Sequence, residues 1–515
     1  MPGFQGLSCL KTSAVAGFLK INRNKRPPRR PKMRQRAVMT IKKTLGRRVR
    51  MALWTVGSLT GLSACSTEEP YTAPFFNFAS SYKSGIEAAP VLLTNDAWWE
   101  RLEDRTLNLL IDRALDDNID LGIARERVIE AHANLEGVPP LGSLTPSASA
   151  QRGETAGVAT SSETTSEAAL GVSWMFDPYG MRRQQIQGAG ALVEVAGAEV
   201  DAARSLLVLN MASAYINLRF NQRLLQLRRK QLASRRQTVD LTRKLFDQGS
   251  AIKLELTRTQ ALQAETEAQI PPLVGAIHGL KSDIAILAGV APGALDINLD
   301  GPVHQPHPTM PTSIGIPADL LRNRPDLRIA ERSYYAAVSD IGVARADLFP
   351  RLSLSGSIGS ARREGVTELE YFFGPSIVFP SLLDNTLKAN VAVQVSQAKQ
   401  GLETWKSTVL SALGEVENAL ASYRGSAASV QKSRQSSQLF SSARNLTRQL
   451  VESGEGTVRD LIDVEQDVAD ADVALAQALQ QLGQDYVALH TSLGAGSNVK
   501  GEKDSPYDVA QDSTE

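Results

Sequence analysis

Four short segments of the chain alternate apolar side chains with small or polar ones at a period of two. They form two pairs, 143–153 with 167–177 and 351–360 with 371–379. The clearest segment alternates two kinds of side chain: Leu170, Val172, Trp174 and Phe176 against Gly171, Ser173, Met175 and Asp177. This period is that of a β-strand, so each pair predicts a hairpin with a polar loop. Strands that are apolar on one face and small or polar on the other are the weak signature of a membrane β-barrel.

The longer segments have a helical pattern and fall into two sets. The first set is 103–136, 181–247 and 252–289, and the second is 326–348, 384–452 and 457–494. The segment 181–247 contains no proline, and a helix of this length spans roughly 100 Å. Such a helix must pack laterally against neighbours. Pro271-Pro272 should break the return helix of the first set. No run of 18 apolar residues is present, so we expect no transmembrane helix.

A duplication links the two sets. Residues 241–261 read LTRKLFDQGSAIKLELTRTQA, and residues 446–466 read LTRQLVESGEGTVRDLIDVEQ. The matching residues, all offset by 205, are Leu241, Thr242, Arg243, Leu245, Gly249 and Leu256 with Leu446, Thr447, Arg448, Leu450, Gly454 and Leu461. Each copy reads as a helix end, a glycine and a new helix start, and such repeats dictate architecture.

The strand count predicts an oligomer. Four strands cannot close a barrel, whereas three chains supply twelve strands and remove the open edges. The predicted fold class is therefore mainly α with a membrane β-barrel. It has two tandem repeats, each a β-hairpin plus a long helical hairpin, and a homotrimer forms a twelve-stranded barrel on an α-helical barrel.

Composition divides the chain into four parts: 1–64, 65–317, 318–496 and 497–515. The first part holds 15 basic and no acidic residues, and the second and third are the two repeats with their linker at 290–317. The last part is a polar tail that we expect to be disordered. From residue 65 onward the chain carries 41 basic and 55 acidic residues, a net charge of −14. An acidic body argues against nucleic acid as a partner.

The first part ends in a secretion signal. Arg47, Arg48 and Arg50 precede a short apolar stretch, 51–62, and small residues lead to Cys65. This pattern predicts a cleaved signal peptide. The ending LSAC resembles a bacterial lipobox, which implies diacylation of Cys65 and sorting to the outer membrane. The alternative is an ordinary signal cut near Ala64 that leaves a free thiol. Residues 1–38 read as an upstream extension, with Met39 as a plausible start, and we assign Cys9 no role.

Residues 316–359 carry a family resemblance. They read IPADLLRNRPDLRIAERSYYAAVSDIGVARADLFPRLSLSGSIG. The residues that carry it are Arg322, Arg324, Pro325, Asp326, Ala330, Glu331, Gly342, Ala344, Arg345, Ala346, Phe349, Pro350, Leu352, Leu354 and Gly356. The stretch resembles TolC-type outer-membrane efflux proteins in their lipoprotein branch (OprM/NodT-like), and the register extends over roughly 95–495.

The resemblance implies a trimeric exit duct without a catalytic site or cofactor. A barrel would lie in outer-membrane lipid, and a helical barrel would cross the periplasm. The implied partners are a periplasmic adaptor protein and an inner-membrane pump, commonly of the resistance-nodulation-division type. The pump would drive the substrate, which the sequence does not identify.

The resemblance also assigns roles to the two helical turns of the repeat. Asp460 and Asp463 lie three residues apart on one helix face, and Glu255 is the first-repeat equivalent of Asp460. In the family, a carboxylate pair here lines a periplasmic gate, although helix N-terminal acids also occur for electrostatic reasons alone. The turns Gly249-Ser250-Ala251 and Gly454-Glu455-Gly456 would meet the adaptor. Val451 and Gly456 stand where some relatives place a Tyr and an Arg that hold the closed state.

Three further motifs or motif classes are candidates for chemistry, and none is strong. His304-x-x-His307 lies in a proline-rich linker without further metal ligands. Ser396-x-x-Lys399 has a serine acyl-enzyme spacing, but it lies within a long helix without companion motifs. The chain has no P-loop, GxSxG or HExxH motif, so we expect no enzyme. The alternatives to an efflux duct are a component of type I protein secretion and a lipid-anchored periplasmic scaffold.

Overall fold

The computed structural model describes residues 71–82, 93–155, 161–301, 304–306, 308, 316–363, 366–380, 385–453 and 455–498. The chain divides into two units, Met1–Ala64 and Cys65–Glu515, and every described residue lies in the second. The predicted lipidation at Cys65, the predicted adaptor contact at Gly454 and the second histidine of the weak His304-x-x-His307 motif fall outside the described residues. In chain order the elements are η2 (Trp98–Leu102), α2 (Arg105–Asp117), α3 (Ile119–Glu136), β1 (Gly142–Thr155), β2 (Ser161–Phe176), α4 (Met181–Asp247), α5 (Lys253–Ala268), α6 (Ile270–Leu287), η3 (Pro317–Asp319), α7 (Leu320–Asn323), α8 (Pro325–Ala346), β3 (Arg351–Arg363), β4 (Val366–Val378), α9 (Thr386–Glu452) and α10 (Val458–Ser492).

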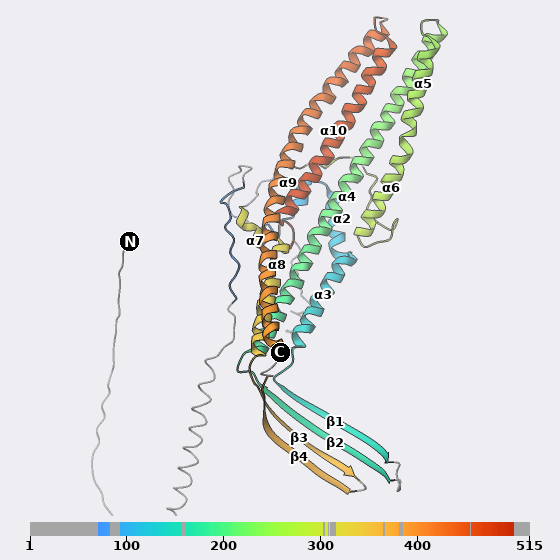
Figure 1. Cartoon of the computed structure of the whole chain (residues 1–515). Coiled ribbons are helices and arrows are strands. Elements are labelled where there is room, and N and C mark those ends of the chain that lie inside the picture. The colour runs from blue at the N-terminus through green and yellow to red at the C-terminus, as the bar shows by residue number, and fades with distance from the viewer. Residues whose placement is uncertain are drawn as a thin grey trace, which may run out of the picture. The chain divides into compact units, whose positions relative to one another are not determined.

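The four strands form one antiparallel sheet in the order β1-β2-β3-β4 (Figure 1). Both predicted hairpins are present, and β2 of the first pairs with β3 of the second. The outer strands β1 and β4 each leave one edge without a partner strand in the described part of this chain. An open edge of 13 or 14 residues is a template for pairing with another strand.

The strand register places the two kinds of side chain on opposite faces of the sheet. Residues paired across the strands share a face, and one such row is Leu144, Val172, Gly356 and Phe373. The next row, Ser143, Ser173, Ser355 and Gly374, lies on the other face. We call these the apolar face and the polar face. The predicted alternation is thus confirmed, and it runs in register through all four strands.

Two aromatic rings on the apolar face lie over glycines of the adjacent strand. A Cβ added at Gly142 would lie 2.7 Å from the Trp174 ring, and one at Gly356 would lie 2.8 Å from the Phe373 ring. Only glycine leaves room for these rings, a cross-strand device that stabilises curved sheets. The large apolar residues of this face, such as Tyr371 and Ile377, remain exposed in the single chain.

The long helices repeat with the offset read from the sequence. Helix α4 and helix α9 each have 67 residues, and they start at Met181 and Thr386, 205 positions apart. The return helices start at Lys253 and Val458 with the same offset. Figure 1 shows each long helix with its return helix extending away from the sheet, and α4 packs against α10 between the two pairs. The two predicted helical hairpins are confirmed.

Two predicted helices are interrupted in the structure, one unexpectedly and one as predicted. The predicted helix 103–136 is split at Asn118, whose backbone is extended and whose side chain caps α3 by accepting from the Leu121 amide. The return helix of the first repeat breaks at Gln269, before the two prolines, as predicted. Proline lacks an amide donor and clashes with the preceding turn, so it is tolerated only at a new helix start.

The apolar core lies where the helices of both repeats meet near the middle of the bundle. On α9 it uses Trp405, Val409, Ala412, Val416, Leu420 and Tyr423, a seam spaced three or four residues apart. Beyond Val430, no described residue of α9 is a buried apolar one, and Leu439, Leu446 and Leu450 are exposed. The last third of α9 thus presents apolar side chains that this chain alone does not cover.

One described helical stretch meets a composition test for a membrane span, unlike the expectation above. Lys253–Leu287, which joins α5 and α6, has a mean hydropathy of 1.2 in its most apolar window. That test averages over polar residues, and α6 itself carries Lys281 and Asp283. The stretch is also broken at Gln269, and α6 packs along α4. We therefore read it as a return helix of the bundle.

Two equivalent glycines close the repeats. Gly289 and Gly494, 205 residues apart, both have φ of +74°. A Cβ at Gly289 would lie 2.2 Å from the Asp117 carbonyl oxygen, and one at Gly494 would lie 2.3 Å from that of Asn323. Each glycine therefore permits both a left-handed backbone and a close approach of two segments.

Candidate functional site

The two helical turns farthest from the sheet form the candidate site, which we call the tip. The same hydrogen bonds build both turns: the Ser250 and Ala251 amides donate to the Leu245 carbonyl, and the Glu455 and Gly456 amides donate to that of Leu450. Gly249 has φ of +73°, the left-handed conformation that ends a helix. The described residues of the two predicted turns thus make equivalent backbone hydrogen bonds.

Apolar side chains stand exposed at the tip. Leu254 is 71% exposed, and Ile252 and Leu450 are also exposed. Val458, at the start of α10 in the second turn, is instead buried. It faces inward because it begins α10 on the side that packs within the bundle. The exposed apolar surface at the tip is therefore carried mainly by the turn of the first repeat and the end of α9.

Asp460 occupies the third position of α10 and closes a capping box with Thr457. The Thr457 hydroxyl and amide donate to Asp460 Oδ2 at 2.6 and 3.2 Å, and the Asp460 amide donates to the Thr457 hydroxyl at 3.2 Å. The side-chain hydrogen bond from Thr457 is the main cause that lowers the pKa of Asp460. The carboxylate is fully exposed, so it is an ionised group available at the tip.

Glu255 makes only half of this arrangement. Its carboxylate accepts from the Ile252 amide at 3.3 Å, but Ile252 has no hydroxyl to return a hydrogen bond. The equivalence of Glu255 and Asp460 therefore holds for the backbone, while the cap is more complete in the second repeat.

Asp463 has different partners from Asp460. Its carboxylate lies 3.9 Å from the guanidinium of Arg459 on its own helix and 3.9 Å from that of Arg258 on α5. Arg258 is the first-repeat equivalent of Asp463, 205 residues earlier. The pair thus joins equivalent positions of the two helical hairpins. Both side chains are at least half exposed, so the ion pair is a weak one.

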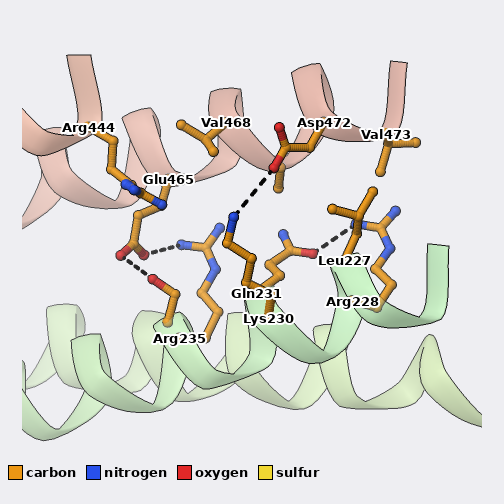
Figure 2. A pocket seen from close by; sticks show the side chains of 12 residues that line it. Leu227, Arg228, Lys230, Gln231, Arg235, Arg444, Glu465, Val468, Asp472 and Val473 are labelled. Carbon is orange, nitrogen blue, oxygen red and sulfur yellow. Dashed lines mark hydrogen bonds and ion pairs between the residues drawn. The ribbon is translucent and has the colours of Figure 1, made fainter. Parts of the chain in front are cut away.

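A buried ion pair lies just behind the tip, and the sequence analysis did not find it. Arg235 on α4 and Glu465 on α10 are only 2% and 6% exposed, and Arg235 Nη1 lies 3.5 Å from Glu465 Oε2 (Figure 2). Glu465 also accepts hydrogen bonds from the Ser234 and Thr238 hydroxyls. The pair therefore fastens the long helix of the first repeat to the return helix of the second.

Arg235 is held on several sides. Its guanidinium donates to the Gln466 side chain at 2.9 Å and to the Ile462 carbonyl at 3.5 Å. Burial lowers the pKa of Arg235, and Glu465 opposes that effect. The pair borders a cavity of about 40 Å³ between α4, α9 and α10, into which Lys230 also reaches toward Asp472 (Figure 2). This volume holds water and little else.

A comparison of the repeats contains the signal that could have identified this pair. At the equivalent positions, 205 residues away, the chain has Phe440 in place of Arg235 and Gln260 in place of Glu465. The charges therefore break the repeat symmetry. Glu465 also lies 3.9 Å from the guanidinium of Arg448 on α9. The charged group therefore occurs once in the chain, whereas the hydrogen-bonded turns occur twice.

The weaker motifs gain no support from their surroundings. Ser396 and Lys399 are both exposed on α9, and the Ser396 hydroxyl accepts from Gln400 at 3.3 Å. His304 is exposed. No group of three metal-ligating side chains occurs among the described residues.

Three comparisons with known proteins agree with this architecture. The family model "Outer membrane efflux protein" matches residues 110–278 and 316–495. Nodulation protein T of Rhizobium leguminosarum bv. viciae is 32% identical over 445 residues, which cover 84% of this chain and 91% of that protein. The pyoverdine export outer membrane protein OpmQ of Pseudomonas aeruginosa is 28% identical over 422 residues, which cover 78% and 87%. The solved outer-membrane channel OprN superposes with a TM-score of 0.77 at 29% identity, covering 84% of this chain and all of that one.

Fold and relatives together define the class as a TolC-like outer-membrane channel, in which strands and a periplasmic helical bundle come from the same chain. The chain belongs to the outer membrane efflux protein family. Its members are channels and not enzymes, and this chain is an outer-membrane component of an efflux pump.

Proposed function

We propose that three copies of this chain assemble into the exit duct of a tripartite pump for small molecules, with Asp460 and Asp463 at its periplasmic gate. The observation that carries the proposal is the sheet: four strands with one apolar face, one polar face and two open edges. Three such sheets joined edge to edge give twelve strands, with lipid outside and water inside. The uncovered apolar residues on the last third of α9 support the same assembly.

The chain after Cys65 supports a lipid anchor. Tyr71 packs against Tyr335 of α8 in a tilted arrangement with ring centroids 4.4 Å apart, and its hydroxyl donates to Glu331 at 2.8 Å. From there α8 continues to Ala346, close to the start of β3, which is roughly 18 Å of helix. A stretch of six residues can span at most roughly 20 Å, which is long enough for a lipid on Cys65 to enter the membrane that holds the sheet.

The gate proposal rests on exposure, position and charge. Asp460 and Asp463 lie at the tip, and threefold symmetry would turn them into two rings of three carboxylates. Like charges held close repel each other and attract cations. The ion pairs of Asp463 with Arg258 and Arg459 would be altered when the hairpins separate.

The partners we propose are a periplasmic adaptor at the tip and an inner-membrane pump, of resistance-nodulation-division type, behind it. The exposed Ile252, Leu254 and Leu450 provide an apolar surface for a helical hairpin of the adaptor. Relatives named for pyoverdine export and toluene efflux transport different molecules, which fits a duct that conducts while its pump selects.

Native mass spectrometry of the mature protein, purified with and without Cys65→Ser, tests the assembly and the anchor. The proposal expects a trimer in both preparations, with a mass increment for diacylglycerol and an acyl chain only in the wild type. A monomer would contradict the duct, and an unmodified Cys65 would contradict the anchor alone.

A further inference from the structure

The polar face of the sheet, which faces the lumen in the proposed duct, carries small side chains along most of β1 and β3. On β1 it carries Ser143, Thr145, Ser147 and Ser149, and on β3 it carries Ser353, Ser355, Ser357 and Gly359. The register fixes these assignments because the four strands pair without interruption. A smooth, hydrated wall of this kind offers little for a passing molecule to bind.

Phe372 departs from this pattern. It lies on the polar face, in the row with Thr145, Gly171 and Ser357, and it is 60% exposed. Its neighbour Phe373 lies on the apolar face, where the ring packs over Gly356. Contact with lipid therefore accounts for an aromatic side chain at position 373. It does not account for one at Phe372, on the face that meets water.

The charges on the polar face near Phe372 are mainly negative. Glu370 is the next residue on this face of β4, followed by Glu368, and Glu167 lies on β2. Arg363 lies 3.4 Å from Glu167 and 3.8 Å from Glu370, so one cation balances only one of three carboxylates. The wall around the ring thus carries a net charge of −2 per chain among these four residues.

Three copies would bring the rings toward the duct axis at one level. Phe372 lies midway along β4, six residues from each end. A twelve-stranded barrel has a backbone radius of roughly 12 Å, given the strand spacing and tilt. A phenyl group standing perpendicular to the sheet extends about 5 Å inward, so three of them narrow the lumen markedly at that level.

We propose that the three Phe372 rings form an aromatic collar in the barrel lumen that binds apolar and aromatic cations on their way out. This inference rests on the trimeric duct proposed above. The ring faces attract cations and stack with aromatic molecules. The surrounding carboxylates raise the local concentration of positively charged molecules. The collar makes the final part of the duct selective, at a site far from the tip.

Block of single-channel current tests the collar. Tetraphenylphosphonium is added on the barrel side of planar bilayers, and tetrabutylammonium serves as the non-aromatic cation of similar size. Because the tip limits the wild-type current, each measurement is also made in the Asp460→Ala/Asp463→Ala background. Phe372→Ala should raise the tetraphenylphosphonium concentration that halves the current about fivefold or more. This is the scale expected for several exposed cation–π contacts. The same variant should change the half-blocking concentration of tetrabutylammonium by less than twofold.

Phe373→Ala is the matched control, because it removes the same side chain from the adjacent residue on the lipid face. It should leave block by both cations unchanged. Equal block of wild type and Phe372→Ala, in a channel that conducts, overturns the collar and leaves the duct intact. A loss of block in Phe373→Ala alone would mean that the two faces are reversed, and it would also overturn the collar. The absence of current from every variant contradicts the duct and the collar together.

Discussion

The buried pair of Arg235 and Glu465 leads to the sharpest prediction about stability. Glu465→Gln keeps the side-chain volume and a carbonyl acceptor but removes the charge that faces Arg235 at 3.5 Å. Coulomb attraction at that distance amounts to about 5 kcal/mol with an effective dielectric constant of 20. Breaking a buried pair typically costs about 3–5 kcal/mol. Since Arg235 keeps its bonds to Gln466 and Ile462, we expect the lower end, about 3 kcal/mol.

Hydrogen exchange of the folded protein, read by mass spectrometry, measures this loss locally. A cost of 3 kcal/mol should raise exchange at the start of α10 and the facing part of α4 by roughly 100-fold. The matched control is Glu267→Gln, which breaks the 3.4 Å pair with Arg236 between α4 and α5, where both side chains are over half exposed. That pair is worth at most about 1 kcal/mol, or less than about sixfold in exchange.

Equal exchange in the two variants would refute the reasoning, because it predicts a far larger loss from the buried, hydrogen-bonded pair than from the exposed one. A large effect confined to the tip turns, without change in α4, would also contradict a pair that fastens α4 to α10. If the pair holds the closed state, Glu465→Gln should in addition raise the fraction of time that single channels spend open.

Three further predictions follow from other parts of the chain. Burial, and then the charge of Arg101, lower the pKa of His490 to about 3, so below pH 6.5 the unfolded chain binds a proton that the folded chain does not. Stability should therefore fall as pH drops from 6.5 toward 3. When the pH is lowered from 7.5 to 4.5, the free energy of unfolding of the wild type, measured by thermal or denaturant unfolding, should fall by roughly 2–3 kcal/mol more than that of His490→Phe. Parallel pH profiles of the two proteins would exclude His490 as the cause. Gly494→Ala should cost about 3 kcal/mol or more in the same measurement, because its Cβ meets the Asn323 carbonyl at positive φ. Gly122→Ala, in open space on α3, should be neutral or slightly stabilising, and a comparable loss in both would refute the argument. Leu254→Asp should abolish pump-dependent resistance in cells while conductance in bilayers stays normal, and a loss of both would place Leu254 in the channel itself.

Much of the architecture is readable from the sequence because its signals are periodic and repeated. Strand alternation gave both hairpins, and the offset of 205 residues at Gly249 and Gly454 gave the two helical hairpins. The break near Pro271 followed from the missing amide of proline. These signals are local, so they survive without knowledge of tertiary contacts.

The remaining features depend on contacts between distant segments. Arg235 and Glu465 are 230 positions apart, and each stands in a polar stretch that looks like a solvated helix face. Val458 follows the exposed turn of the second repeat directly, yet the packing of α10 buries it. Phe372 and Phe373 are adjacent and alike in sequence, and only the strand register assigns them to opposite faces.

Single-channel conductance of the purified mature protein in planar bilayers, wild type beside Asp460→Ala/Asp463→Ala, tests the central claim most directly. A gated exit duct should give small, cation-selective currents in the wild type and larger, less selective currents in the double variant. Identical currents would contradict a gate at these carboxylates. The absence of current from both would contradict the duct and favour a lipid-anchored helical scaffold.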